Sequence, residues 1–130
     1  MVCSASGVRE EHEEEELTEE GSQRERPLPT DPEPVWSRWL AEQMGGVAEY
    51  QLPCRGRVDI LTDTLACEVE WVKKGYGEAI GQAVYYGLMT ERQPAIILLL
   101  RGKPTEAKYL ERAKLTAGKL HIPVFTWMTT

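Results

Sequence analysis

The sequence predicts an α/β domain whose helices and strands follow the order αβββαβαβ around a mixed central sheet. Two observations lead to this class. Three segments have the apolar spacing or the glycine and proline boundaries of helices, and the runs between them have the length and composition of strands. The chain has 130 residues, which is enough for one domain and leaves little room for a second hydrophobic core.

The first half of the domain is predicted to contain one helix and three strands. Pro34 suits the first position of a helix, apolar side chains follow it at helical spacing, and Gly45-Gly46 ends it. Turn residues separate the next three runs, which we expect to form an antiparallel meander. The predicted helix covers residues 34–44, and the predicted strands cover residues 47–52, 57–62 and 65–71.

The second half of the domain alternates helix and strand. Its most distinctive segment, residues 95–100, contains only aliphatic side chains and therefore indicates a strand that is buried on both faces. A proline near the start and a glycine near the end delimit the helix that follows it. The predicted elements are a helix over residues 76–91, the buried strand, a helix over residues 104–119 and a strand over residues 122–127.

The first 34 residues differ from the rest of the chain in charge and in apolar content. They carry eleven acidic side chains and three arginines, a net charge of −8, whereas residues 35–130 carry a net charge of +2. We therefore predict a disordered acidic, proline-rich tail over residues 1–34 and a folded domain over residues 35–130. A tail that docks a partner or imitates a phosphate backbone is the alternative. The overall charge of −6 thus does not exclude a nucleic-acid partner.

Cysteine content and hydropathy exclude several classes of protein. The three cysteines have no metal-like spacing and only two histidines accompany them, so neither a zinc site nor a disulfide scaffold is indicated. The longest apolar run is far shorter than the roughly 20 residues that a membrane-spanning helix needs. The N-terminus also lacks an apolar signal segment. We expect an intracellular, cytoplasmic protein, with the nucleoid or nucleus as other options.

Residues 63–64 are predicted to form a two-residue hairpin turn between the second and third strands. This turn places Asp59 opposite Glu68 and Arg57 opposite Glu70. The two-residue alternation of strands then directs these four side chains to one face of the sheet. We expect that face to be a site and the opposite, apolar face to be the core.

Facing carboxylates repel each other unless a cation lies between them. Glu49 of the first strand has the parity that can direct it to the face of Asp59 and Glu68, so three carboxylates can converge. Such oxygen ligands suit Mg²⁺ or Mn²⁺, whose shells are completed by water and phosphate oxygens. The chemistry supported is phosphodiester hydrolysis. A solvated sheet face on which Arg57 pairs with Glu70 is the alternative.

These segments together resemble the PD-(D/E)XK nuclease superfamily. That family has an αβββαβ core with an acid on the second strand and a (D/E)-X-K motif on the third. The corresponding segments here are Gly56-Arg57-Val58-Asp59 and Glu68-Val69-Glu70. Gln82-Ala83-Val84-Tyr85-Tyr86 is similar to the Gln-x-x-x-Tyr motif of the RecB-like and exonuclease-like branches. The resemblance covers residues 35–127 and implies the three-layer core of restriction endonucleases and Holliday junction resolvases.

One position departs from the family pattern, because Glu70 stands where the family has its motif lysine. Lys73 and Lys74 follow the third strand directly. Since members of the family can move this positive charge to a neighbouring position, the resemblance implies that one of these two lysines replaces it. Ordinary solvated lysines in a loop are the alternative.

The resemblance implies a Mg²⁺- or Mn²⁺-dependent nuclease that hydrolyses DNA, or RNA, with a metal-activated water. A catalytically inactive nuclease-fold domain that binds nucleic acid or a partner protein is the alternative. We expect no membrane association, and a homodimer is an option. The expected metal ligands are Glu49, Asp59 and Glu68. The expected catalytic set is Asp59, Glu68, Glu70, Lys73, Lys74 and Gln82. The residues expected to contact nucleic acid are Arg55, Arg57, Tyr86, Arg101 and Lys103.

Overall fold

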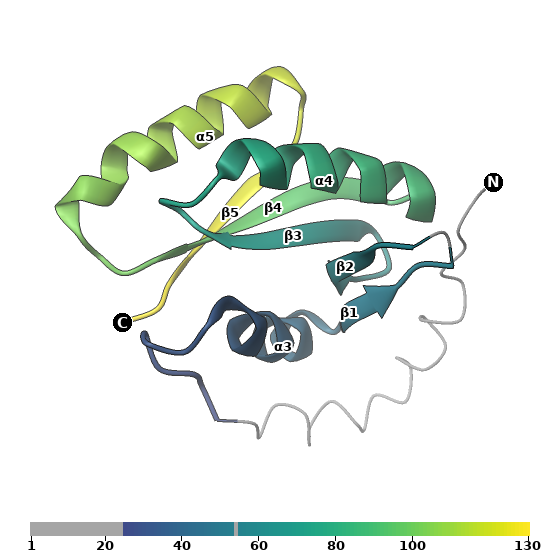
Figure 1. Cartoon of the computed structure of the whole chain (residues 1–130), viewed down its shortest axis with the longest axis horizontal. Helices are drawn as coiled ribbons and strands as arrows, with labels where there is room; N and C mark the ends of the chain where they lie inside the picture. The colour runs from purple at the N-terminus through teal and green to yellow at the C-terminus, as the bar shows by residue number, and fades with distance from the viewer. Residues whose placement is uncertain (1–24, 54) are drawn as a thin grey trace.

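A five-stranded mixed sheet occupies the centre of the computed structural model, with its strands side by side in chain order (Figure 1). The structure describes residues 25–130 except residue 54. Within this part, α3 covers one face of the sheet, and α4 and α5 cover the other. The elements are α3 (Glu33–Met44), β1 (Val47–Gln51), β2 (Arg57–Leu61), β3 (Leu65–Trp71), α4 (Tyr76–Thr90), β4 (Gln93–Leu100), the 3-10 helix η1 (Pro104–Glu106), α5 (Ala107–Lys119) and β5 (Val124–Met128).

Strand direction changes across the sheet. β1, β2 and β3 pair antiparallel, as the turn residues between them predict. β3, β4 and β5 pair parallel, and α4 and α5 are the crossover connections that parallel neighbours require. The α/β class, the element order and the mixed sheet predicted from the sequence are confirmed.

Most element boundaries agree with the sequence prediction. Gly45 ends α3 in the left-handed conformation (φ 70°), and the next N–H, of Gly46, bonds to the carbonyl of Ala41 at 2.8 Å. The largest differences are that the helix expected over residues 104–119 starts as the 3-10 turn η1, that β4 begins two residues early at Gln93, and that the last strand begins two residues late at Val124. None of the helices in the described part of the chain is both long and apolar enough to cross a membrane.

Both faces of the sheet are buried, which corrects the prediction of one core face and one open site face. Alternate residues of β4 point to opposite sides. One set packs with Trp36 and Trp39 of α3, and the other packs with Ile80 and Ala83 of α4 and with α5. The sheet is covered by helices on both sides because the amphipathic faces of α3, α4 and α5 each need an apolar partner. The candidate site therefore has to lie where strand pairing ends.

Residues 25–34, which the sequence analysis assigned to a disordered tail, contact the domain. Arg26 lies over the rings of Trp36, Trp39 and Trp127 at 5.5–5.7 Å, and its guanidinium donates to the carbonyl of Met128 at 2.8 Å. The indole N–H of Trp36 donates to the carbonyl of Leu28 at 3.1 Å. The folded unit thus includes this segment. Residues 1–24, the rest of the predicted tail, lie outside the described residues.

Candidate active site

A polar cavity of about 320 Å³ opens between β1, β2, β3 and α4. It brings together five of the candidate site residues named in the sequence analysis, and Gln51 and Gly56 complete its lining. The cavity is lined by Gln51, Gly56, Arg57, Asp59, Glu68, Gln82 and Tyr86. Carboxylate, amide, phenol and guanidinium groups thus converge on one space, which is the combination expected of a site that handles charged ligands.

Asp59 and Glu68 reach the cavity because the β2–β3 ladder stops beside them. The pairs Leu61↔Ala66 and Ile60↔Cys67 have the register predicted from the hairpin turn. At the next step the Asp59 side chain enters the ladder, and its Oδ2 accepts the backbone N–H of Val69 at 2.9 Å. A side chain in this position ends the regular pairing of the two strands. The carboxyl groups of Asp59 and Glu68 then face the cavity.

Glu68 is buried and Asp59 is half-buried, and both pKa values are raised. Burial, together with the negative charge of Asp59, raises the pKa of Glu68 to about 9. Burial also raises the pKa of Asp59, against the opposing effect of the Val69 N–H, a hydrogen bond with Glu68 and the Arg57 guanidinium. Glu68 Oε2 is buried and has no hydrogen-bond partner. In the absence of a cation, Glu68 therefore retains a proton at neutral pH.

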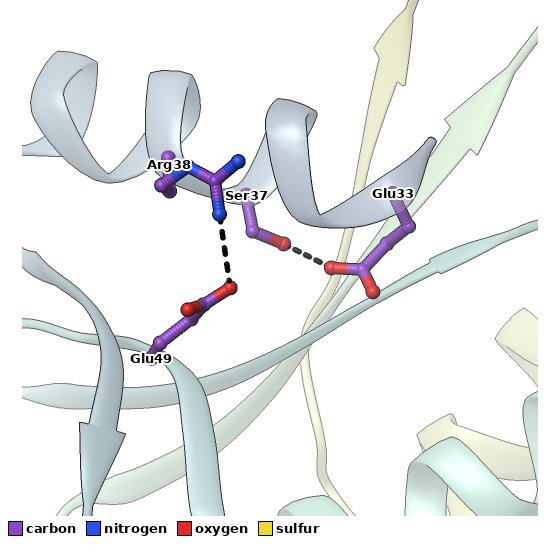
Figure 2. A network of polar contacts seen from close by, with 4 residues as sticks. All are labelled: Glu33, Ser37, Arg38 and Glu49. Carbon is purple, nitrogen blue, oxygen red and sulfur yellow. Dashed lines mark hydrogen bonds and ion pairs between the residues drawn. The ribbon is translucent and has the colours of Figure 1, made fainter. Parts of the chain in front are cut away.

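A third carboxyl group, Glu33 at the start of α3, lies near this pair and was not predicted. Burial, followed by the charge of Asp59, raises the pKa of Glu33 to about 7. Its carboxylate accepts a hydrogen bond from Ser37 one turn later in the helix (Figure 2). The sequence analysis counted Glu33 as part of the acidic tail. The signal that could have separated it is its position directly before Pro34, at the start of the first predicted helix.

The Gln-x-x-x-Tyr segment of α4 forms one wall of the cavity. Gln82 and Tyr86 lie one turn apart on α4 and both line it. The Tyr86 hydroxyl accepts the N–H of Arg57 at 3.5 Å. Gly56 has φ 97°, and a Cβ atom there would lie 2.9 Å from the Tyr86 ring. Only glycine allows this turn to pass so close to the tyrosine, so Tyr86 holds the start of β2 against α4.

Glu49 does not line the cavity. Its carboxylate accepts a hydrogen bond from Arg38 of α3, with 3.3 Å between Nη1 and Oε2 (Figure 2). Glu49 has φ 52°, which breaks the two-residue alternation on which its predicted orientation depended. Gln51, which shares its parity, lines the cavity instead. The structure thus brings together two of the three predicted metal ligands, Asp59 and Glu68.

Glu70, Lys73 and Lys74 also lie outside the cavity lining. The Glu70 carboxylate accepts the backbone N–H of Trp71 at 3.0 Å. Among the described residues no ion pair joins it to Arg57, so the predicted cross-strand charge pair is absent there. Lys73 and Lys74 are exposed in the turn between β3 and α4. The structure therefore brings neither lysine to the carboxyl pair.

Two of the five residues expected to contact nucleic acid, Arg57 and Tyr86, line the cavity. Arg55 is exposed in the loop that precedes β2. Arg101 and Lys103 lie in the loop after β4, where the Arg101 guanidinium stacks 3.7 Å above the Trp71 ring. The buried Glu106 carboxylate accepts three successive backbone N–H groups of that loop, at 2.9–3.1 Å. The backbone of this loop is therefore well fixed, and Arg101 and Lys103 lie outside the cavity lining.

The carboxyl pair has the chemistry of a site for a hard cation. In the described residues no three His, Cys, Asp or Glu side chains converge closely enough to hold a metal ion. Mg²⁺, however, is commonly held by one or two carboxylates, with water and substrate phosphate in its other positions. The unpartnered Oε2 of Glu68 and the proton retained by this residue are the features that a bound cation would change. Asp59 and Glu68 thus fit Mg²⁺ or Mn²⁺ as a two-carboxylate set.

Comparison with known proteins adds no relative to this description. No protein-family model matches the chain. Comparisons with curated proteins and with solved structures find no match either. The site's geometry and chemistry are therefore the basis for a functional assignment.

Proposed function

We propose that this chain is a Mg²⁺- or Mn²⁺-dependent nuclease that hydrolyses phosphodiester bonds, with the three-layer core of the PD-(D/E)XK superfamily. DNA is the expected substrate and RNA is the other option. The observation that carries this proposal is the carboxyl pair of the half-buried Asp59 and the buried Glu68, which lines a polar cavity together with Gln82 and Tyr86. The four residues come from the three elements that the resemblance requires, namely the second strand, the third strand and the helix after it.

Glu68 supports the proposal because a buried carboxyl oxygen without a partner does not stabilise the fold. A buried carboxyl group that lacks a compensating partner destabilises a fold, and such groups are found mainly at functional sites. Glu68 has this character, since its Oε2 has no partner and its pKa is raised to about 9. The nearby Glu33, whose pKa is raised to about 7, adds to the same concentration of negative charge.

The residues would share the work of hydrolysis as follows. Asp59 and Glu68 would hold the cation, which when bound activates a water and stabilises the charge that develops on the phosphate. Gln82 faces the same space from α4, and its amide can orient a water or a phosphate oxygen. Tyr86 keeps the start of β2 in place through its contacts with Gly56 and Arg57.

The test is a cleavage assay on labelled single-stranded, duplex and branched DNA and on RNA, with and without Mg²⁺ or Mn²⁺. We expect metal-dependent cleavage by the wild type and a loss of at least about 10²-fold in Asp59→Asn, by analogy with removal of one preorganised electrostatic group. Asp63→Asn, in the exposed β2–β3 turn, is the matched control and should behave as the wild type. Equal activity of Asp59→Asn and wild type would contradict the proposal.

One observation favours the second candidate, an inactive nuclease-fold domain that binds nucleic acid or a protein. No lysine is among the described residues that line the cavity, and Glu70 stands at the motif position. If the wild type cleaves no substrate in the panel but binds one of them with the affinity of Asp59→Asn, this second function is the correct one.

A further inference from the structure

We infer that Arg57, and neither Lys73 nor Lys74, is the catalytic residue that contacts the scissile phosphate and supplies the positive charge of the missing motif lysine. This inference rests on the proposed function and names a residue role within the same site. Three observations support it: which cations line the cavity, what the Arg57 side chain contacts, and how its backbone is held.

Arg57 is the one positively charged side chain among the described residues that line the cavity. Lys73 and Lys74 are exposed in the turn after β3, where the N–H of Lys74 bonds to the carbonyl of Trp71 at 2.9 Å. This bond closes the turn beyond the end of the strand. Neither lysine lines the cavity of Asp59 and Glu68, whereas Arg57 does.

The guanidinium of Arg57 is available for a ligand. Within the described residues it forms no ion pair and no side-chain hydrogen bond, and the carboxylate predicted to pair with it, Glu70, accepts the Trp71 N–H instead. A guanidinium presents a planar set of donors that matches two phosphate oxygens, and it stays charged at every relevant pH. An exposed arginine at the mouth of a polar cavity therefore suits phosphate recognition.

The position of Arg57 is fixed although its side chain is exposed. Its backbone pairs with Gln51 across β1 and β2, and its N–H donates to the Tyr86 hydroxyl at 3.5 Å. The preceding Gly56 packs against the same tyrosine ring. These contacts fix the backbone of Arg57 two residues before Asp59, and the side chains of both residues line the same cavity. Arg57 is thus a neighbour of the proposed metal ligand.

The test compares Arg57→Gln, Arg57→Lys, Lys73→Ala and Lys74→Ala in the full chain, with Arg112→Gln on the exposed side of α5 as the matched control. On the wild type's best substrate we expect Arg57→Gln to lose about 10²-fold or more in kcat. Arg57→Lys should retain part of that rate because it keeps the charge without the planar donors. Arg112→Gln should cleave as the wild type does.

A second measurement reads phosphate contact without any reaction. A labelled oligonucleotide should bind the metal-free Arg57→Gln variant more weakly than the wild type, and the slope of log Kd against log salt should fall by about one, because one phosphate contact is gone. Unchanged thermal melting of the variant shows that the fold is intact. An unaltered affinity and salt slope would contradict the inference even if the variant were less active.

The outcomes separate this inference from the proposed function. If the wild type shows metal-dependent cleavage and Arg57→Gln is equally active, the role of Arg57 is overturned. The nuclease assignment then still holds. Loss of activity in Lys73→Ala or Lys74→Ala, with Arg57→Gln unaffected, would restore the displaced lysine. A wild type without metal-dependent cleavage on any substrate overturns both proposals.

Discussion

The middle of β4 and Glu68, at the end of the β2–β3 pair, are about equally buried but differ in chemistry. Residues 95–99 of β4 are at most 4% exposed, and all of them are aliphatic. Glu68 in the adjacent strand is 5% exposed and carries a carboxyl group. Burying one large aliphatic side chain stabilises a fold by about 1.5–3 kcal/mol, whereas burying an uncompensated carboxyl group opposes folding.

This difference separates residues that are present for stability from those that are present for function. Every side chain in the middle of β4 has an apolar partner from α3, α4 or α5. Asp59 and Glu68 have few partners, and Glu68 Oε2 has none. An unpartnered carboxyl oxygen within an otherwise apolar and well-packed interior indicates a functional site.

The largest expected effect on stability comes from one substitution in β4, compared with one at Glu68. Leu98→Ala removes a fully buried side chain of β4 and should lower the free energy of unfolding by about 2–5 kcal/mol. Glu68→Gln keeps the shape but removes the ionisable group, so at pH 8 we expect unchanged or higher stability. Chemical denaturation measures both. Leu115→Ala, at an exposed position of α5, is the control, and a large loss in Glu68→Gln would break the comparison.

The pH dependence of stability should report the carboxyl groups directly. The pKa of Glu68 is raised from 4.5 to about 9 in the folded state, so its favourable contribution is complete below about pH 4.5. That contribution is then lost as the pH rises through 9, because the unfolded chain releases the proton earlier. Glu33, with its pKa raised to about 7, changes stability in the same direction over a lower range.

We therefore expect the free energy of unfolding to fall between pH 5 and pH 9, by at most about 1.4 kcal/mol per pH unit from Glu68. Glu68→Gln should flatten this dependence, and urea denaturation at a series of pH values measures it. A wild-type stability that rises over the same range would show that Glu68 is ionised in the folded protein.

A smaller effect is expected where Arg26 lies over three tryptophans next to the α3 side of the core. Arg26→Ala removes these cation–π contacts and the hydrogen bond to the Met128 carbonyl. It should lower stability by about 0.5–2 kcal/mol. Arg26→Lys, which retains a charge and a donor, should lose less. Equal melting temperatures for Arg26→Ala and wild type would show that residues 25–34 do not contribute to the folded unit.

The smallest effect is expected at Glu49. The Arg38–Glu49 ion pair is partly exposed, so Glu49→Gln should change stability by less than about 1 kcal/mol. Because its carboxylate contacts Arg38 and does not line the cavity, we also expect an unchanged affinity for Mn²⁺ in calorimetry. Asp59→Asn is the comparison variant, and it should weaken Mn²⁺ binding strongly. A similar weakening in Glu49→Gln would confirm the ligand role predicted from the sequence.

The candidate site could be predicted from the sequence only in part. The hairpin turn fixed the pairs Ile60↔Cys67 and Leu61↔Ala66, and with them the proximity of Asp59 and Glu68. Helical spacing likewise predicted that Gln82 and Tyr86 share a face. The predicted orientation of Glu49 was wrong because the prediction assumed regular strand alternation. Glu49 adopts a left-handed backbone conformation, which the spacing of side chains along the sequence does not reveal.

The sequence by itself determined the elements, their order and the register of the β2–β3 hairpin, because turns, caps and periodicity act between residues close together in the chain. Only the tertiary structure decided which charges meet. Glu33 approaches Asp59 because α3 packs against the sheet, and Arg57 rather than a lysine borders the cavity because Tyr86 of α4 holds the start of β2. Such contacts depend on how helices dock onto the strands, and residue spacing along the chain does not contain that information.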